Sequence, residues 1–164
     1  MSNIFDILNE LKKFSKEIVT IGKPLVHQDV TDFEEKYNLK LPKDFKFFLK
    51  SYNGFSLMGT EILGFNRDNE SIDSVYQYEH ELVSFRQYNY LVPFHNDGRG
   101  NFYCLDTRGC NMDSDTCQII FWVSNYIYTE TDQPEITHNG FSDFVQEVII
   151  EWTLEDYDYN GNPK

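Results

Sequence analysis

The chain has 164 residues, of which 40% are hydrophobic and 16% aromatic, so one domain with a substantial core is expected and a disordered chain is excluded. Its formal net charge is −13. Such a charge repels phosphate backbones and anionic lipid and attracts cationic partners, so direct binding to nucleic acid or to a membrane is not expected.

Two helices are predicted near the N-terminus. Apolar residues recur at helical spacing over residues 4–18, and Asn3 and Asp6 are placed to cap the first turn. A second helix is predicted over residues 28–38, where Asn38 can take the left-handed conformation that ends a helix.

A third helix is predicted between residues 41 and 55. Pro42 suits a first helical turn, and Asn53 with Gly54 supplies the turn that stops the helix. The apolar face is formed by Phe45, Phe48, Leu49 and Tyr52. Phe47 lies off that face, which predicts that a second layer covers it.

The middle of the chain alternates strands and one helix. A short strand is predicted over residues 59–65 and a helix over residues 71–85. Residues 88–106 follow the pattern strand, glycine-rich turn, strand. Pro93 cannot donate a ladder hydrogen bond, so it places the first of these strands at a sheet edge or at a strand end.

The last third is predicted to form a buried strand, a second strand and a helix. Residues 118–123 are apolar on both faces, as in a central strand, and residues 126–131 are interpreted as another strand. A C-terminal helix is predicted after them. Its apolar face is formed by Phe141, Phe144, Val145, Val148, Ile149 and Trp152. Residues 156–164 are polar and predicted to fray.

This order of elements predicts an α+β fold in one domain over residues 1–164, with a largely antiparallel or mixed sheet packed by N-terminal helices and a C-terminal helix. There is no apolar run of about 20 residues and no basic, apolar leader, so we expect a cytoplasmic protein. Three cysteines are an odd number and indicate free, largely buried thiols.

The stretches VTDFEEKYNLKLPKDFKFFLKSYNGF, ILGF, DGRGNFYCLD and QIIFWV, taken in this order, resemble the SUKH superfamily, which includes the yeast cell-wall assembly regulator and many small bacterial proteins. The resemblance covers residues 28–125. Asn38 departs from it, because many members carry glycine there, although both residues tolerate the left-handed conformation. The residues that match the family pattern, interpreted as structural, are Phe33, Glu34, Leu41, Pro42, Asn53, Gly54, Gly64, Asp97, Gly100, Asp106 and Trp122.

The resemblance implies an α+β binding domain and, in bacteria, an immunity protein that neutralises a toxin domain, often a nuclease. The negative charge agrees with a basic toxin as partner. The alternative is a general interaction or scaffold module with an endogenous regulatory partner. The oligomeric state is not predicted. Residues proposed for partner binding are Asp113, Asp115, Tyr126, Tyr128, Glu130, Asp132, Glu155 and Asp156, with Tyr157 as a further aromatic anchor.

Two motifs suggest chemistry but have simpler interpretations. The turn HNDGRG holds His95 and Asp97, yet neighbours in a turn usually point apart, so we interpret it as structural and a hydrolase based on this pair as a minor alternative. NMDSDT has the first spacing of a calcium loop but lacks its glycine and its glutamate. The cysteine gaps match no zinc site. We therefore predict no catalytic residue, metal or cofactor.

Overall fold

Two antiparallel sheets organise the computed structural model, which describes residues 2–68 and 70–164. The first has the order β1-β2-β3 and the second the order β4-β5-β6-β7. The strands are β1 (Val19–Ile21), β2 (Phe55–Leu57), β3 (Thr60–Ile62), β4 (Leu91–Asn96), β5 (Phe102–Asp106), β6 (Ile119–Trp122) and β7 (Glu135–His138). The Leu63 amide donates to the carbonyl of Phe94 at 2.8 Å, which ties the first sheet to β4.

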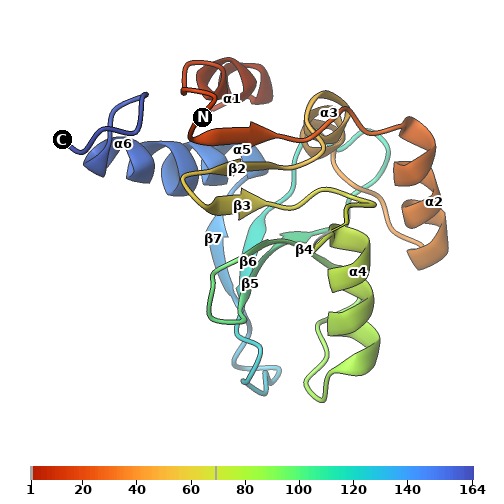
Figure 1. The fold of residues 1–164 in the computed structure, drawn as a ribbon. Coiled ribbons are helices and arrows are strands. Elements are labelled where there is room, and N and C mark those ends of the chain that lie inside the picture. The colour runs from red at the N-terminus through yellow and green to blue at the C-terminus, as the bar shows by residue number, and fades with distance from the viewer. Residues whose placement is uncertain (1, 69) are drawn as a thin grey trace.

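Helices cover both sheets (Figure 1). They are α1 (Ile4–Leu11), α2 (His27–Tyr37), α3 (Lys43–Ser51), α4 (Ile72–Gln77) with the π-helical turn η1 (Tyr78–Leu82), and a C-terminal helix made of α5 (Phe141–Phe144), the π-helical η2 (Val145–Glu151) and α6 (Trp152–Asp156). In Figure 1, α4 runs alongside the second sheet, while α1 lies over the C-terminal helix. The chain is therefore an α+β single domain, as predicted. Within the described residues, no helix has the length and apolar character needed to span a bilayer.

The N-terminal helix begins as predicted and ends early. The side chain of Asn3 accepts a hydrogen bond from the amide of Asp6 at 3.0 Å. The helix stops at Leu11, however, because the residues that follow turn and lead into β1, a strand that the sequence analysis missed. The second helix ends at the predicted place, with Asn38 at φ 50°.

The third helix fits its prediction except at one aromatic residue. Pro42 is its N-terminal cap, and the amides of Lys43 and Asp44 donate to backbone carbonyls of the β5–β6 connection. Phe47 is 37% exposed, and its ring contacts Phe5, which is itself 60% exposed. The prediction of a covering layer over Phe47 is therefore met only in part, because α1 places Phe5 against the ring but leaves 37% of Phe47 exposed.

Asp44 is expected to make stability depend on pH. Burial, opposed by hydrogen bonds from Thr116 and the Phe45 amide, raises the pKa of Asp44 to about 6. A raised folded-state pKa means that the native state prefers the protonated form, so the stability from this preference is present below the unfolded pKa and is lost as pH rises through 6. Asp44→Asn should therefore stabilise the protein by roughly 2 kcal/mol at pH 8 and by little at pH 4.

Thermal unfolding of the wild type and Asp44→Asn across this pH range measures the difference. The control is Asp113→Asn, which removes a carboxylate that is exposed to solvent. A gain that does not grow with pH, or one that Asp113→Asn reproduces, would contradict the assignment to Asp44.

The second sheet confirms two predictions and corrects a third. β4 carries Pro93 and lies at the edge of its sheet, whereas β6 lies between β5 and β7. Residues 126–131 are not a strand, because Thr129 and Asp132 close a hydrogen-bonded turn and the Tyr128 hydroxyl accepts the amide of Val123. The strand that follows β6 in the second sheet is β7 (Glu135–His138) instead.

The C-terminal helix departs from the predicted period. Its middle is π-helical, so each turn takes more residues than an α-turn and the buried face rotates. Ile150 is consequently buried, whereas Trp152, predicted on the buried face, is 56% exposed.

The segment 156–164 also differs from its prediction. The ring of Tyr159 packs on Phe14 with centroids 4.9 Å apart, and its hydroxyl donates to Glu10. Its carbonyl accepts the amide of Ser15 at 2.8 Å. These contacts hold the tail against the end of α1, so it does not fray.

Candidate functional site

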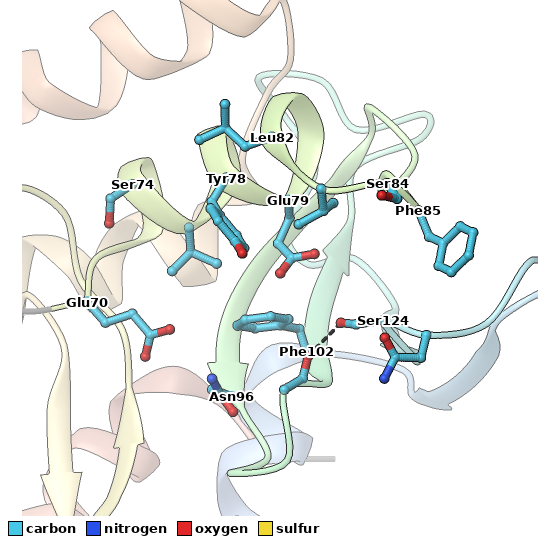
Figure 2. A pocket seen from close by; sticks show the side chains of 14 residues that line it. Glu70, Ser74, Tyr78, Glu79, Leu82, Ser84, Phe85, Asn96, Phe102 and Ser124 are labelled. Carbon is cyan, nitrogen blue, oxygen red and sulfur yellow. Dashed lines mark hydrogen bonds between the residues drawn. The ribbon is translucent and has the colours of Figure 1, made fainter.

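A cleft of about 800 Å³ opens between α4 and the second sheet (Figure 2). One side is formed by α4, η1 and residues 83–85. The other side contains Asn96, Phe102 and Ser124, at the ends of β4, β5 and β6 that meet at one edge of the sheet. We call this space the α4 cleft. It brings together segments that are far apart in the sequence.

Glu79 is the notable polar group of the α4 cleft. Only 4% of the residue is exposed, and its Oε2 atom has no hydrogen-bond partner among the described residues. Figure 2 shows its carboxylate pointing from η1 toward Phe102. Burial, and to a smaller extent the charge of Glu70, raises the pKa of Glu79. An ionised carboxylate in this position lacks the compensation that buried charges normally have.

The backbone around Glu79 is firmly held. Its carbonyl accepts the amide of Gln87 at 3.0 Å, and the amide of Val83 reaches back to the carbonyl of Tyr78 at 3.3 Å. The ring nitrogens of His80 lie 2.7 Å and 3.0 Å from the carbonyls of Tyr76 and Tyr88. These bonds fix the π-helical turn, a feature that often occurs at functional sites. The unpaired carboxylate is thus positioned by the fold.

Two more buried polar atoms near this turn have no partner in the described part of the chain, Gln87 Nε2 and Trp122 Nε1. Their side chains do not line the α4 cleft. The thiol of buried Cys104 lies 3.8 Å from Gln87 Oε1, and burial raises the pKa of that thiol, so it stays protonated and unreactive.

The rim of the α4 cleft is apolar and exposed. Tyr78 is 55% exposed, Leu82 69% and Phe85 41%. Large apolar side chains grouped around a cleft are typical of surfaces that bind a partner. At the sheet side, the Ser124 hydroxyl donates to the carbonyl of Gly100 at a hydrogen-bonding distance of 2.5 Å, which fixes the start of the β6–β7 connection beside the cleft.

The structure separates the residues proposed for partner binding into three places. The β5–β6 connection carries Asp113 and Asp115, at the end of β6 that faces α3, and α6 carries Glu155 and Asp156. The β6–β7 connection, next to the α4 cleft, carries Tyr126, Tyr128, Glu130 and Asp132. Tyr157 follows α6 and forms a bridge with Pro163. The eight residues and Tyr157 therefore do not make one continuous patch.

In the β6–β7 connection the tyrosines extend an aromatic row. Tyr128 lies 4.7 Å from Trp122 and 4.8 Å from Tyr126, measured between ring centroids. The Tyr126 hydroxyl donates to the carboxylate of Asp132. This part of the proposed surface combines exposed aromatic and acidic groups beside the α4 cleft.

Several residues of the family pattern make structural contacts. Buried Glu34 accepts the Leu41 amide at 2.8 Å. Asn53 makes two hydrogen bonds of 2.8 Å to the backbone of Phe65. Asp106 pairs with Arg108 at 2.8 Å. Of the others, Phe33, Leu41, Pro42, Gly64 and Trp122 are buried, and Gly54 and Gly100 have positive φ.

The HNDGRG turn holds its two candidate groups in different networks. Burial lowers the pKa of His95, whose Nδ1 lies 2.7 Å from the carbonyl of Glu61. Burial alone would raise the pKa of Asp97, but bonds from the Arg99 amide and from Asn101 lower it. Asp97 thus closes its own turn, while His95 contacts the backbone of β3.

Metal-ligating side chains are scattered over the fold. Across residues 2–68 and 70–164, no three His, Cys, Asp or Glu side chains come together as a possible metal site. The three cysteines are free thiols, and Cys104 and Cys117 are buried.

Glu79 is not among the site residues that the sequence predicts. The residue lies in a helix with an imperfect apolar period, where an acidic side chain is interpreted as solvated. A signal was present, since the irregular spacing of Tyr76, Leu82 and Val83 reflects the wider π-helical turn that points Glu79 inward.

Comparisons with known proteins identify relatives over most of the chain. The family model SUKH_5, described as SMI1-KNR4 cell-wall, matches residues 4–151. The uncharacterized protein YnaB of Bacillus subtilis (strain 168) is 33% identical over 86 residues, which are 52% of this chain. The chain spans about half the length of this curated relative, since the match covers 52% of that protein.

A solved structure shares the fold. The crystal structure of a protein from Pseudomonas syringae pv. tomato matches with a TM-score of 0.61 and 15% sequence identity, covering 90% of this chain and 98% of that chain. At this identity the likeness concerns the fold alone.

Proposed function

Because the chain belongs to the SUKH family of SMI1-KNR4 cell-wall proteins, we propose that it is a non-enzymatic immunity protein that binds and neutralises a basic toxin domain, such as a nuclease. The family is known for immunity functions and for protein interaction, which supports this class of function. The net charge of −13 supports a cationic partner, because opposite charges speed association.

The observation that carries the proposal is the α4 cleft. It combines an unpaired, buried carboxylate with an exposed apolar rim and an adjacent acidic, aromatic loop. Aromatic anchors around a desolvated polar contact are the usual composition of a binding hot spot. A folded protein partner with a basic surface fits this composition.

The first experiment is affinity purification of the tagged protein from its own cells at low salt, followed by mass spectrometry. The recovered partner is then titrated, and its toxic activity is measured with and without the protein. A basic toxin domain that binds at nanomolar affinity and is inhibited would support immunity. Recovery of a cell-wall or regulatory protein that is not inhibited would favour the scaffold alternative.

Charge reversal should locate the surface. Glu130→Lys with Asp132→Lys, beside the α4 cleft, should slow association with the basic partner by about tenfold at low salt, because electrostatic steering is lost. Stopped-flow association rates at several salt concentrations measure the effect. Asp113→Lys with Asp115→Lys is the matched control, since it changes the same charge at the other end of β6. Equal slowing by the two pairs would argue against the cleft side as the binding surface.

A further inference from the structure

We propose that the α4 cleft receives an arginine side chain of the partner protein, with Glu79 as its ion-pair acceptor. This inference rests on the proposed function, because it names the partner group that the cleft selects. It depends on three observations: the charge inside the cleft, the state of Glu79 and the aromatic residues that line the cleft.

The charge inside the α4 cleft is entirely negative. Of the described residues that line it, Glu70 and Glu79 are the ionisable acids and none is lysine, arginine or histidine. Within the described structure, Glu70 and Glu79 take part in no ion pair. A cationic group is therefore the complementary ligand.

Glu79 supplies the deep contact. A carboxylate that is 4% exposed, with one oxygen unpaired in the described structure, carries a desolvation cost already met by folding. A cation that enters the cleft meets an oxygen that has already lost its water, and its positive charge favours the ionised form of Glu79 over the protonated form that burial favours. The contacts of His80 with the carbonyls of Tyr76 and Tyr88 fix the backbone that carries Glu79 in the absence of the partner, which lowers the entropic cost of binding.

The lining of the cleft favours arginine over lysine. Phe102, Phe85 and Tyr78 line the same space as Glu79, and Figure 2 shows the Glu79 carboxylate directed toward the Phe102 ring. A guanidinium group can stack on an aromatic face while it donates two hydrogen bonds to a carboxylate. It is also more weakly hydrated than an ammonium group, so it enters a half-apolar cleft more easily.

The test uses small probes and needs no identified partner. The probes are N-acetyl-arginine methylamide, the corresponding lysine compound, and the citrulline compound, which has nearly the shape of arginine but no charge. Each is titrated into the isotope-labelled protein of residues 1–164, and binding is followed by the amide NMR signals. We expect arginine to shift the signals of Leu82, Phe102 and Ser124 and to bind at least about tenfold more tightly than citrulline and several-fold more tightly than lysine.

Protein variants assign the effect to one carboxylate. Glu79→Gln should remove the preference for arginine over citrulline, and Glu79→Leu should do the same if the amide of glutamine disturbs the fold. Glu81→Gln is the control, since it removes an exposed charge two residues away. Both Glu79 variants should melt at or above the wild-type temperature, because each removes a buried carboxyl group whose Oε2 atom has no partner in the described structure. A purely structural role for Glu79 predicts lower melting temperatures.

Three results would overturn the inference: equal affinity for arginine and citrulline, signal shifts away from the α4 cleft, or an arginine preference that survives Glu79→Gln. Tighter binding of the lysine compound would overturn the choice of arginine. These outcomes leave the proposed function open to its own test, because a toxin can still be captured and inhibited through another surface.

Discussion

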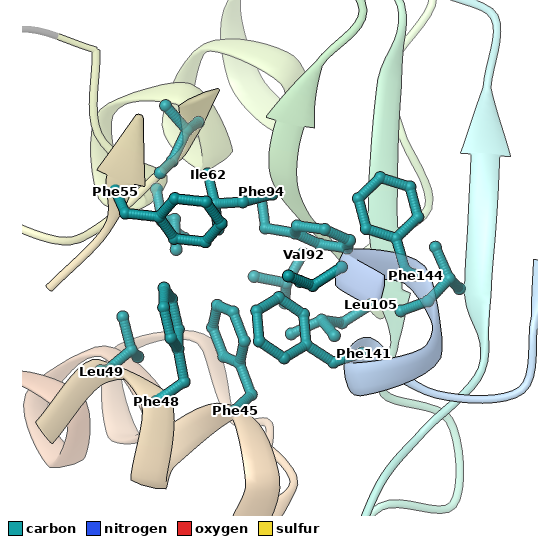
Figure 3. Packing of buried hydrophobic residues seen from close by; sticks show 14 of the residues in the cluster. Phe45, Phe48, Leu49, Phe55, Ile62, Val92, Phe94, Leu105, Phe141 and Phe144 are labelled. Atoms are coloured by element: carbon teal, nitrogen blue, oxygen red, sulfur yellow. The ribbon is translucent and has the colours of Figure 1, made fainter. Parts of the chain in front are cut away.

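Phe141→Ala is expected to lower the free energy of unfolding by about 3–5 kcal/mol, the cost of removing a large aromatic side chain from a packed core. Phe141 is fully buried and begins the C-terminal helix. Its ring centroid lies 4.9 Å from that of Phe45, 5.0 Å from Phe48 and 5.4 Å from Phe94. Figure 3 shows it between the aromatic residues of α3 and those of β4.

The large cost follows from the position of Phe141 between elements. Its ring joins α3, β4 and the C-terminal helix, so backbone movement in one element cannot close the cavity without disturbing the other two. Chemical denaturation gives the free energy, and thermal unfolding should show a melting temperature lower by roughly 10 °C.

The control for Phe141→Ala is Phe5→Ala. Phe5 is 60% exposed and packs on one ring, that of Phe47. It should cost less than about 1 kcal/mol, because little apolar surface returns to water. If both variants lost the same stability, the core would not be centred on Phe141.

Gly64→Ala is the second change expected to have a large effect, a loss of about 3 kcal/mol or more through overpacking. A Cβ atom at this position would lie 2.3 Å from Asn53 Oδ1 and 2.4 Å from the Asn53 carbonyl oxygen. Asn53 cannot move away freely, because its side chain makes both hydrogen bonds to Phe65. The substitution must therefore break these bonds or displace the backbone that follows α3.

Gly98→Ala separates this crowding from ordinary backbone strain. Gly98 has φ +82°, and no heavy atom lies within 4 Å of the place that a Cβ atom would occupy. It should cost about 1 kcal/mol, the penalty for a side chain in the left-handed region. Urea denaturation of both variants gives the comparison, and equal losses would show that the contact with Asn53 is not the cause.

Local patterns predicted much of the fold. The cap at Asn3, the left-handed Asn38 and the edge position of Pro93 depend on a few neighbouring residues, and the structure contains all three. Each depends on sterics and hydrogen bonding between neighbouring residues, so it can be predicted from the local sequence.

The errors arise where distant contacts decide the structure. β1 consists of three residues and exists because Val19 to Ile21 pair with β2, more than thirty residues later. The apolar pattern of the C-terminal helix does not reveal π-helical turns, so it places Trp152 on the wrong face. The polar composition of the tail predicts fraying because it says nothing about the docking of Tyr159 on Phe14.

The candidate site is partly accessible to sequence reasoning. The β6–β7 connection is predicted as a binding segment from its acidic and aromatic residues. The structure places this connection next to the α4 cleft. The cleft itself is not predicted, because it is formed by α4, β4, β5 and β6 together. Glu79 is buried and its neighbour Glu81 is exposed, and the only local sign of this difference is the irregular apolar spacing of the helix that carries them.

The docking of the tail on α1 affects how the chain folds during synthesis. Glu10 is synthesised 149 residues before its partner Tyr159, and Phe14, which packs on the same ring, is also synthesised long before it. The ribosome delivers the chain from its N-terminus, so α1 emerges long before the residues that complete its packing. Glu10 and Phe14 therefore remain without this partner until the segment that carries Tyr159 has been synthesised.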